Sequence, residues 1–274
     1  MRQASSNVDA KHYDTARLRE EYLVTNLMVA DEINMVYSMF DRIIAGGAVP
    51  VKEELVLEAP EILRAEWFTQ RRELGIINVG GDGIVKVGDE EYVIPHKEAI
   101  YVGRGNRHVS FRSLDPEHPA HFYFNSATAH RETGVKQVSK KDAVVMHCGS
   151  LEESNERTIN RLLVKEVVPC CQLQMGMTEL APGSTWNTMP AHTHDRRMEV
   201  YFYFDLAEGA AVCHFMGEPQ ETRHIWMSNE QAVISPQWSI HSACATRNYT
   251  FIWGMCGEND DYGDMDWCAT ENLR

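Results

Sequence analysis

The segment that most constrains this chain runs from residue 192 to residue 204 and reads His-Thr-His-Asp-Arg-Arg-Met-Glu-Val-Tyr-Phe-Tyr-Phe. Its second half alternates with a period of two residues, which predicts a β-strand. One face of this strand would consist of methionine, valine and phenylalanine, and the other of Glu199, Tyr201 and Tyr203. Because the second face carries polar tips, we expect it to line a polar cavity rather than a sealed core.

Three histidines accompany the carboxylate at the start of this strand. Residues two apart on a strand point to the same side, so His192 and His194 can both reach into one cavity. Glu199 lies at an odd offset from them and needs a turn at residues 195–197. The segment Pro-Gln-Trp-Ser-Ile-His, which ends at His241, adds a third imidazole. Together these four residues predict a metal site on the strands of a small barrel.

The donor types indicate which ions and which kind of site to expect. Three neutral imidazoles and one carboxylate suit zinc, and also manganese, iron, nickel or cobalt. A closed structural zinc site more often uses cysteine, and a lumen with polar tips favours an open coordination position and therefore catalysis. The alternative is a set of hydrogen-bonded histidines on the wall of a barrel.

The neighbours of the expected ligands supply candidate catalytic residues. Arg196 and Arg197 could bind a substrate carboxylate in bidentate fashion, or they could form a solvated turn. Tyr201 and Tyr203 could donate protons or hydrogen bonds to a substrate, although packing inside a barrel explains them equally well. Together with Glu199, these four residues are the predicted catalytic set.

Composition excludes several classes of partner. The formal net charge of −14 argues against nucleic acid and anionic membranes, since both require a positive surface. No run approaches the roughly 18 to 20 apolar residues that a membrane span needs, and the first residues lack a signal-peptide pattern. Seven cysteines, two of them adjacent and none in a Cys-x-x-Cys pair, form a poor disulfide framework. We therefore expect a cytoplasmic protein with reduced thiols.

The rest of the chain is typical of an all-β sandwich or barrel with a few short helices. Helices are expected near residues 15–23 and, after Pro60, over residues 61–68. The expected strands cover residues 75–79, 84–87 and 92–94, and a hairpin over 211–216 and 221–227 that turns at 217–220. The acidic stretch 258–266 resembles a calcium loop only superficially, because its spacing does not fit an EF-hand.

A faint internal repeat predicts two barrels. Residues 70–74 read Gln-Arg-Arg-Glu-Leu, and residues 196–200 read Arg-Arg-Met-Glu-Val. When Glu73 is set against Glu199, the positions of the paired histidines fall on Glu66 and Phe68, so the first copy would lack them. We therefore expect a first barrel over residues 1–150 without metal and a second barrel over 151–274 with the metal site, joined by the polar segment 150–165. A chance match is the alternative.

The metal-site pattern resembles the two sequence motifs of the cupins. Its first part is His192-Thr-His194-(four residues)-Glu199, and its second is the proline-led segment that ends at His241. The glycines that usually frame these motifs are largely missing, and Trp238 stands where a glycine is common. The resemblance implies two cupin-type jelly-roll barrels and points to a particular branch of the superfamily.

Longer segments throughout the chain resemble the 5-keto-4-deoxyuronate isomerases. Their residues are 29–32, 41–47, 71–81, 188–201, 217–224, 229–236 and 249–255. The resemblance implies a cytoplasmic homohexamer that converts 5-keto-4-deoxyuronate to 3-deoxy-D-glycero-2,5-hexodiulosonate in bacterial pectin degradation. It also implies one zinc ion per subunit, which would fall on His192, His194, Glu199 and His241. All four ligands are present.

In such a reaction a metal would polarise the substrate carbonyl while a proton or a hydride moves between adjacent carbons. The sequence does not identify the general base. Two other functions remain open: isomerisation of another deoxy sugar acid, as in inositol catabolism, and a non-catalytic sugar-sensing cupin. Neither a helix-turn-helix signal nor a basic patch supports a regulator of that kind.

Overall fold

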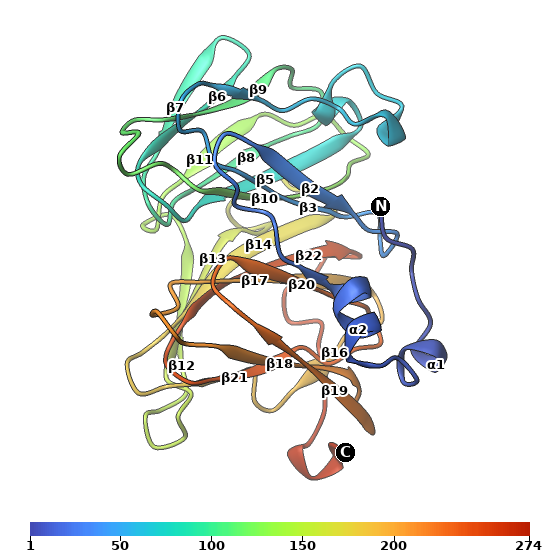
Figure 1. Cartoon of the computed structure of the whole chain (residues 1–274). Coiled ribbons are helices and arrows are strands. Elements are labelled where there is room, and N and C mark those ends of the chain that lie inside the picture. The colour runs from blue at the N-terminus through green and yellow to red at the C-terminus, as the bar shows by residue number, and fades with distance from the viewer. The chain divides into compact units, whose positions relative to one another are not determined.

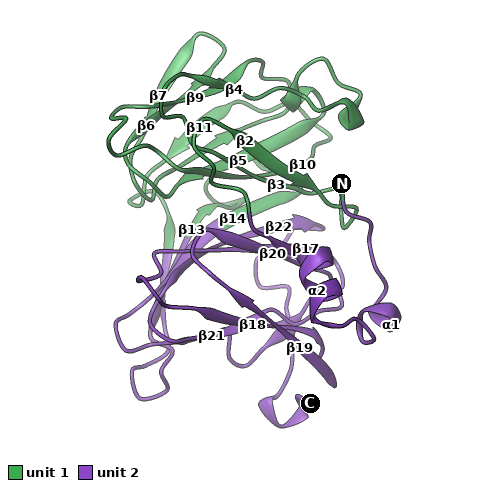
Figure 2. Cartoon of the chain, viewed as in Figure 1, with its two compact units in different colours: residues 1, 26–144, 161–175 green, residues 2–25, 145–160, 176–274 purple.

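The computed structural model describes all residues from 1 to 274 and divides them into two compact units. Unit 1 consists of residues 1, 26–144 and 161–175, and unit 2 consists of residues 2–25, 145–160 and 176–274 (Figure 2). The chain therefore passes between the units several times, which differs from the single boundary expected at residue 150. The internal repeat relates strands to strands, and it contains no sign that residues 2–25 pack with residues 176–274.

Unit 1 is a pair of antiparallel sheets. The six-stranded sheet has the order β11-β8-β5-β10-β3-β2. Its strands are β2 (Ile33–Tyr37), β3 (Ile44–Ala48), β5 (Arg72–Asn78), β8 (Ala99–Val102), β10 (Phe122–Thr128) and β11 (Val135–Val138). The four-stranded sheet β4-β9-β6-β7 consists of β4 (Leu55–Val56), β6 (Gly83–Val87), β7 (Glu90–Ile94) and β9 (Val109–Ser113). Phe111 packs on Phe122 and Phe124, with ring centroids 5.2 and 6.3 Å apart, in the core of this unit.

Two further sheets, most of whose residues belong to unit 2, form the same kind of pair. The larger sheet has the order β1-β20-β17-β22-β14-β13-β12. Its strands are β1 (Leu23–Val24), β12 (Val144–Cys148), β13 (Arg157–Leu163), β14 (Leu173–Leu180), β17 (Arg197–Phe204), β20 (Gln231–Ser235) and β22 (Thr250–Gly257). The smaller sheet β15-β21-β18-β19 consists of β15 (Trp186–Asn187), β18 (Val212–Glu218), β19 (Glu221–Met227) and β21 (Ser242–Ala245). A separate two-stranded ladder joins β16 (His192–Thr193) to β23 (Asp266–Trp267).

The order of the strands repeats between the units. In the larger sheets, whose corresponding strands are labelled in Figure 1, the order β8-β5-β10-β3-β2 corresponds to β20-β17-β22-β14-β13. In the smaller sheets β4-β9-β6-β7 corresponds to β15-β21-β18-β19. This correspondence pairs β5 with β17, as the alignment of Glu73 with Glu199 requires. The all-β, two-barrel prediction is confirmed.

The local predictions had mixed outcomes. The first helix is α2 (Thr15–Tyr22), capped by the Asp14 carboxylate, which accepts a hydrogen bond from the backbone N–H of Arg17; the short α1 (Asn7–Ala10) precedes it. The hairpin is also confirmed, with Glu218 opposite Glu221. The expected helix over 61–68 was wrong. Only the 3-10 turns η1 (Glu61–Leu63) and η2 (Phe68–Gln70) form there, because Arg64 adopts a left-handed φ of 47° that ends the first turn.

A further 3-10 turn, η3 (Thr270–Asn272), lies near the C-terminus. None of the helices has the length and apolar character that a bilayer crossing requires.

Candidate metal centre

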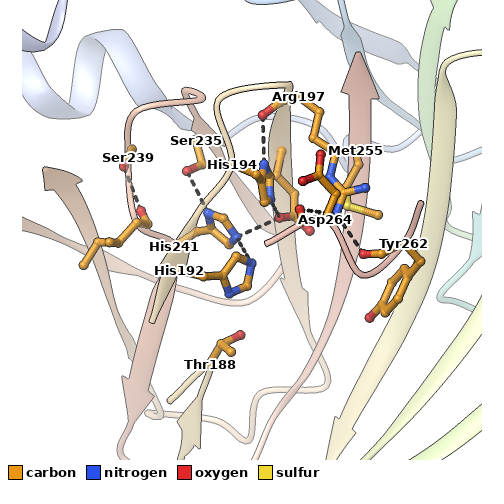
Figure 3. Close-up of polar contacts among 12 residues, drawn as sticks. Thr188, His192, His194, Arg197, Ser235, Ser239, His241, Met255, Tyr262 and Asp264 are labelled. Carbon is orange, nitrogen blue, oxygen red and sulfur yellow. Dashed lines mark hydrogen bonds and ion pairs between the residues drawn. The ribbon is translucent and has the colours of Figure 1, made fainter. Parts of the chain in front are cut away.

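The four predicted ligands converge inside unit 2. His192 belongs to β16, His194 follows it, Glu199 belongs to β17 and His241 immediately precedes β21. Each is at most 4% exposed, and one ligand atom from each lies within 4.8 Å of the others. Figure 3 shows the rings of His192, His194 and His241 close to one another. The turn expected between the paired histidines and the glutamate occupies residues 195 and 196. This turn changes the direction of the chain, so that the Glu199 carboxylate faces the same point as the imidazoles of His192 and His194.

The distances between the side chains identify the donor atoms. The His241 Nε2 lies 2.9 Å from the His192 Nε2 and 2.9 Å from the Glu199 Oε2. The His194 Nε2 lies 3.1 Å from the same carboxylate oxygen. Each imidazole therefore presents its Nε2 to the common centre, and the carboxylate presents its Oε2.

Contacts behind the imidazoles orient them for this task. The His194 Nδ1 lies 2.9 Å from the backbone carbonyl of Arg197. Because a carbonyl only accepts hydrogen bonds, Nδ1 carries the proton and the Nε2 lone pair is left for a ligand bond. The His241 Nδ1 lies 3.4 Å from the Ser235 hydroxyl, whereas the buried Nδ1 of His192 has no partner.

The charge states fit a divalent cation. Burial, together with the neighbouring His241, holds the pKa of His192 well below its usual value, so this imidazole is neutral. Burial alone would raise the pKa of Glu199, but the facing imidazoles of His241 and His194 outweigh it and hold that pKa well below its usual range. A buried carboxylate facing the Nε2 atoms of three imidazoles is the donor set that zinc and related ions select.

The two tyrosines of β17 lie deeper in the barrel. The Tyr201 ring centroid lies 5.3 Å from that of His241 and 4.6 Å from that of Phe251, and its hydroxyl interacts with the side chain of Thr188. The Tyr203 hydroxyl lies 2.8 Å from the His214 Nδ1. Both rings are buried, and this burial raises the pKa of both hydroxyls.

The polar surroundings expected along this face of β17 are therefore found at its Glu199 end. Beyond that end the barrel interior is packed with aromatic rings. Phe251 of β22, Tyr249 immediately before it and His214 of β18 lie against the ring of Tyr203. The sequence pattern of β17 alone could not show what its neighbours contribute.

The two arginines bind a segment of the protein itself. The Arg196 guanidinium forms ion pairs with Asp264 and Asp266, at 2.9 Å from its Nε to the Asp264 Oδ2 and 2.9 Å from its Nη1 to the Asp266 Oδ2. The Arg197 side chain is fully buried. Its Nη1 donates to the Asn259 side-chain oxygen and the Asp261 carbonyl, and its Nη2 donates to two further carbonyls, of Tyr262 and Asp264.

These contacts differ from the predicted substrate clamp, because the terminal guanidinium nitrogens already have protein partners. The partners lie 62 to 70 residues further along the chain, beyond the reach of any local pattern. We refer to residues 258–267, which both arginines hold, as the C-terminal strap.

Comparisons with known proteins agree with this geometry. The model of the KduI/IolB family matches residues 22–269. A 4-deoxy-L-threo-5-hexosulose-uronate ketol-isomerase of Bacteroides fragilis is 60% identical over 274 residues, covering 100% of this chain and 98% of the relative. An isomerase of the same name from Formosa agariphila is 57% identical, with the same coverage.

Solved structures show the same fold. An IolB-like protein from Salmonella typhimurium superposes with a TM-score of 0.73 at 15% identity, covering 92% of this chain and 97% of that one. An oxalate decarboxylase from Lactobacillus farciminis gives a TM-score of 0.56 at 10% identity, covering 85% and 87%. A family match across most of the sequence and close relatives of equal length lead to one conclusion: the chain is a member of the KduI/IolB family.

Proposed function

We propose that this chain is a ketol-isomerase that converts 4-deoxy-L-threo-5-hexosulose uronate to 3-deoxy-D-glycero-2,5-hexodiulosonate in the degradation of pectin and related uronates. The observation that carries the proposal is the convergence of three imidazoles and one carboxylate on one buried point. The full-length relatives that bear the name of this activity support it.

The proposed cofactor is one zinc ion per subunit, held by His192, His194, Glu199 and His241. The three imidazole Nε2 atoms and the carboxylate oxygen described above fit this ion, and the hydrogen bonds at Nδ1 orient the rings of His194 and His241. When bound, a divalent ion of this kind supplies Lewis-acid polarisation of a carbonyl and stabilises negative charge on its oxygen.

The protein's own side chains bind and shield the substrate. The Tyr201 hydroxyl keeps its proton because burial raises its pKa, so it can donate a hydrogen bond to an oxygen near His241. Tyr203 and His214 brace the wall behind it through their 2.8 Å contact. Arg196 and Arg197 act as positioning residues through the strap rather than as contacts to the substrate.

The remaining features of the proposal follow from the family resemblance and the composition. We propose a cytoplasmic homohexamer whose partner is a small sugar acid. A net charge of −14 disfavours nucleic acid and anionic membranes as ligands.

One experiment tests the activity. The purified protein is analysed for bound metal and is then incubated with 4-deoxy-L-threo-5-hexosulose uronate, and isomerisation is followed by NMR. We expect one zinc per chain and conversion to the diulosonate. A metal-loaded protein that binds the uronate without converting it would instead favour the sensing function.

A pair of variants tests the metal site. His194→Ala is expected to lose both metal and turnover, whereas His224→Ala, a change at an exposed histidine on β19, should retain both. Full turnover by a metal-free His194→Ala protein would contradict the proposed role of the ion.

A further inference from the structure

A tryptophan on the C-terminal strap lies beside the metal centre. β23 pairs with β16 so that Trp267 stands directly opposite His192. Residues opposite each other in an antiparallel ladder project from the same side, and the two ring centroids are 5.1 Å apart at 63°. The backbone N–H of Cys268 donates to the Ala191 carbonyl at 2.8 Å and continues the ladder.

Most of this indole faces outward. Trp267 is 58% exposed, whereas the histidine beneath it is 4% exposed. Tryptophan is normally well buried, and a large aromatic ring left exposed beside candidate ligands is an arrangement that ligand-binding surfaces use. The indole meets the ring of a candidate metal ligand in an edge-type contact, and its remaining surface is exposed.

The strap fixes the position of the tryptophan through buried and charged contacts. Asp266, the preceding residue, pairs with Arg196, which also pairs with Asp264. Arg197 binds the carbonyls of three strap residues, Asp261, Tyr262 and Asp264. Both arginines lie between His194 and Glu199 in the sequence, so the segment that carries two ligands also positions the tryptophan.

We propose that Trp267 is a substrate-binding residue, whose exposed indole packs against the carbon–hydrogen face of the sugar acid while the carbonyl end of the substrate lies at the metal centre. The inference rests on the proposed function. A deoxy sugar has a methylene group where other sugars have a hydroxyl, and an aromatic face accommodates a methylene without leaving a buried hydroxyl unpaired.

Steady-state kinetics with 4-deoxy-L-threo-5-hexosulose uronate test the proposal. Trp267→Ala should raise KM about tenfold, equivalent to about 1.4 kcal/mol, with a smaller change in kcat and unchanged zinc content. Trp267→Phe should recover much of the affinity, because an aromatic surface remains. The matched control is Trp226→Ala on β19. Trp226 is 52% exposed and makes no ring contact with the three histidines of the candidate metal site.

Binding provides a second measurement. The uronate should change the tryptophan fluorescence of the wild-type protein and of Trp226→Phe, but the change should be largely lost in Trp267→Phe. If Trp267→Ala keeps the wild-type KM in a protein that turns over normally, the inference fails while the proposed function stands. A wild-type protein that shows neither turnover nor a fluorescence change would overturn both the proposed isomerase function and the Trp267 contact. A fluorescence change that depends on Trp267 but comes without turnover would support the Trp267 contact and contradict the isomerase function.

Discussion

Two buried glutamates occupy corresponding places in the two barrels and have opposite surroundings. Glu73 lies on β5 and Glu199 on β17, the corresponding strands of the larger sheets. The Glu73 carboxylate accepts hydrogen bonds from the Tyr101 hydroxyl at 2.8 Å and from three consecutive backbone N–H groups, of residues 171 to 173, at 2.6 to 2.9 Å. Glu199 instead meets imidazole Nε2 atoms at 2.9 to 3.1 Å.

The nature of the opposing atoms decides what each carboxylate does. Four donors match the lone-pair sites of one carboxylate, so Glu73 is satisfied and fastens β5 to the 171–173 segment. At Glu199 the facing atoms are imidazole nitrogens, and the Nδ1 contact of His194 leaves its Nε2 lone pair directed at the carboxylate. A bound cation would stabilise this arrangement. One strand position in a repeated barrel thus serves as a structural fastener in unit 1 and as a metal ligand in the proposed site of unit 2.

The largest expected effect comes from removing the charge of the carboxylate at the metal centre. Glu199→Gln keeps the shape of the side chain but weakens metal binding, so kcat/KM should fall more than about a hundredfold. The isosteric Glu73→Gln serves as the control and should retain metal. Metal analysis and kinetics of both variants check this. Equal losses of metal in the two proteins would break the comparison.

The next largest effect is on stability. Glu73→Ala leaves the backbone N–H groups of residues 171 to 173 without their acceptor, and it should lower the free energy of unfolding by about 3 kcal/mol or more. Denaturant unfolding measures this loss, with Glu117→Ala, a change at an exposed carboxylate, as the control. The surviving folded protein should keep its metal. A free energy of unfolding close to that of the wild type would show that the hydrogen bonds between Glu73 and residues 171–173 do not stabilise the fold.

The free energy of unfolding should depend on pH through His214, which is buried in the interior of unit 2. Burial lowers the pKa of His214 to about 3, so the folded protein holds this imidazole neutral while the unfolded chain takes up a proton. The resulting stability is fully present above the unfolded pKa near 6.5 and is lost as pH falls toward the folded value. Between pH 7 and 5 this amounts to about 2 kcal/mol.

Replacing His214 checks this dependence. His214→Gln still offers an acceptor to Tyr203 but does not titrate. Unfolding free energies measured from pH 7 to 5 should therefore fall less steeply in the variant. Parallel curves for the variant and the wild type would contradict the prediction.

The smallest expected effect compares two buried arginines. Arg197 holds the strap, whereas Arg72 of unit 1 binds the Ser126 hydroxyl and the carbonyls of Ser126 and Arg42. Arg197→Met should release the strap, lower kcat/KM about tenfold and expose residues 258–267 to protease. Arg72→Met should affect stability alone. If Arg197→Met keeps the wild-type kcat/KM although its strap is sensitive to protease, the position of the strap does not affect catalysis.

Local patterns in the sequence predicted the parts of the molecule that depend on neighbouring residues. The alternation after Met198 predicted β17, and the spacing of His192 and His194 predicted that both imidazoles face the same site. The expected helix over 61–68 failed because nothing in the local sequence marks the left-handed backbone at Arg64. The strap, its hold on Arg196 and Arg197, and the pairing of β23 with β16 join residues more than 60 positions apart, and no local periodicity carries that information.

The N-terminal residues of unit 2 bear on how the protein is made. The short strand β1 forms the edge of the larger sheet by pairing with β20, and the Asn7 side chain donates to Glu218 at 2.8 Å. On the ribosome, the first 25 residues emerge long before their partners. At about 5 to 20 residues per second, β1 waits roughly 10 to 40 seconds for β20. Unit 2 is therefore closed at this edge by a strand that is synthesised long before its partner, and the barrel with the metal centre can finish folding only after β20 has been synthesised.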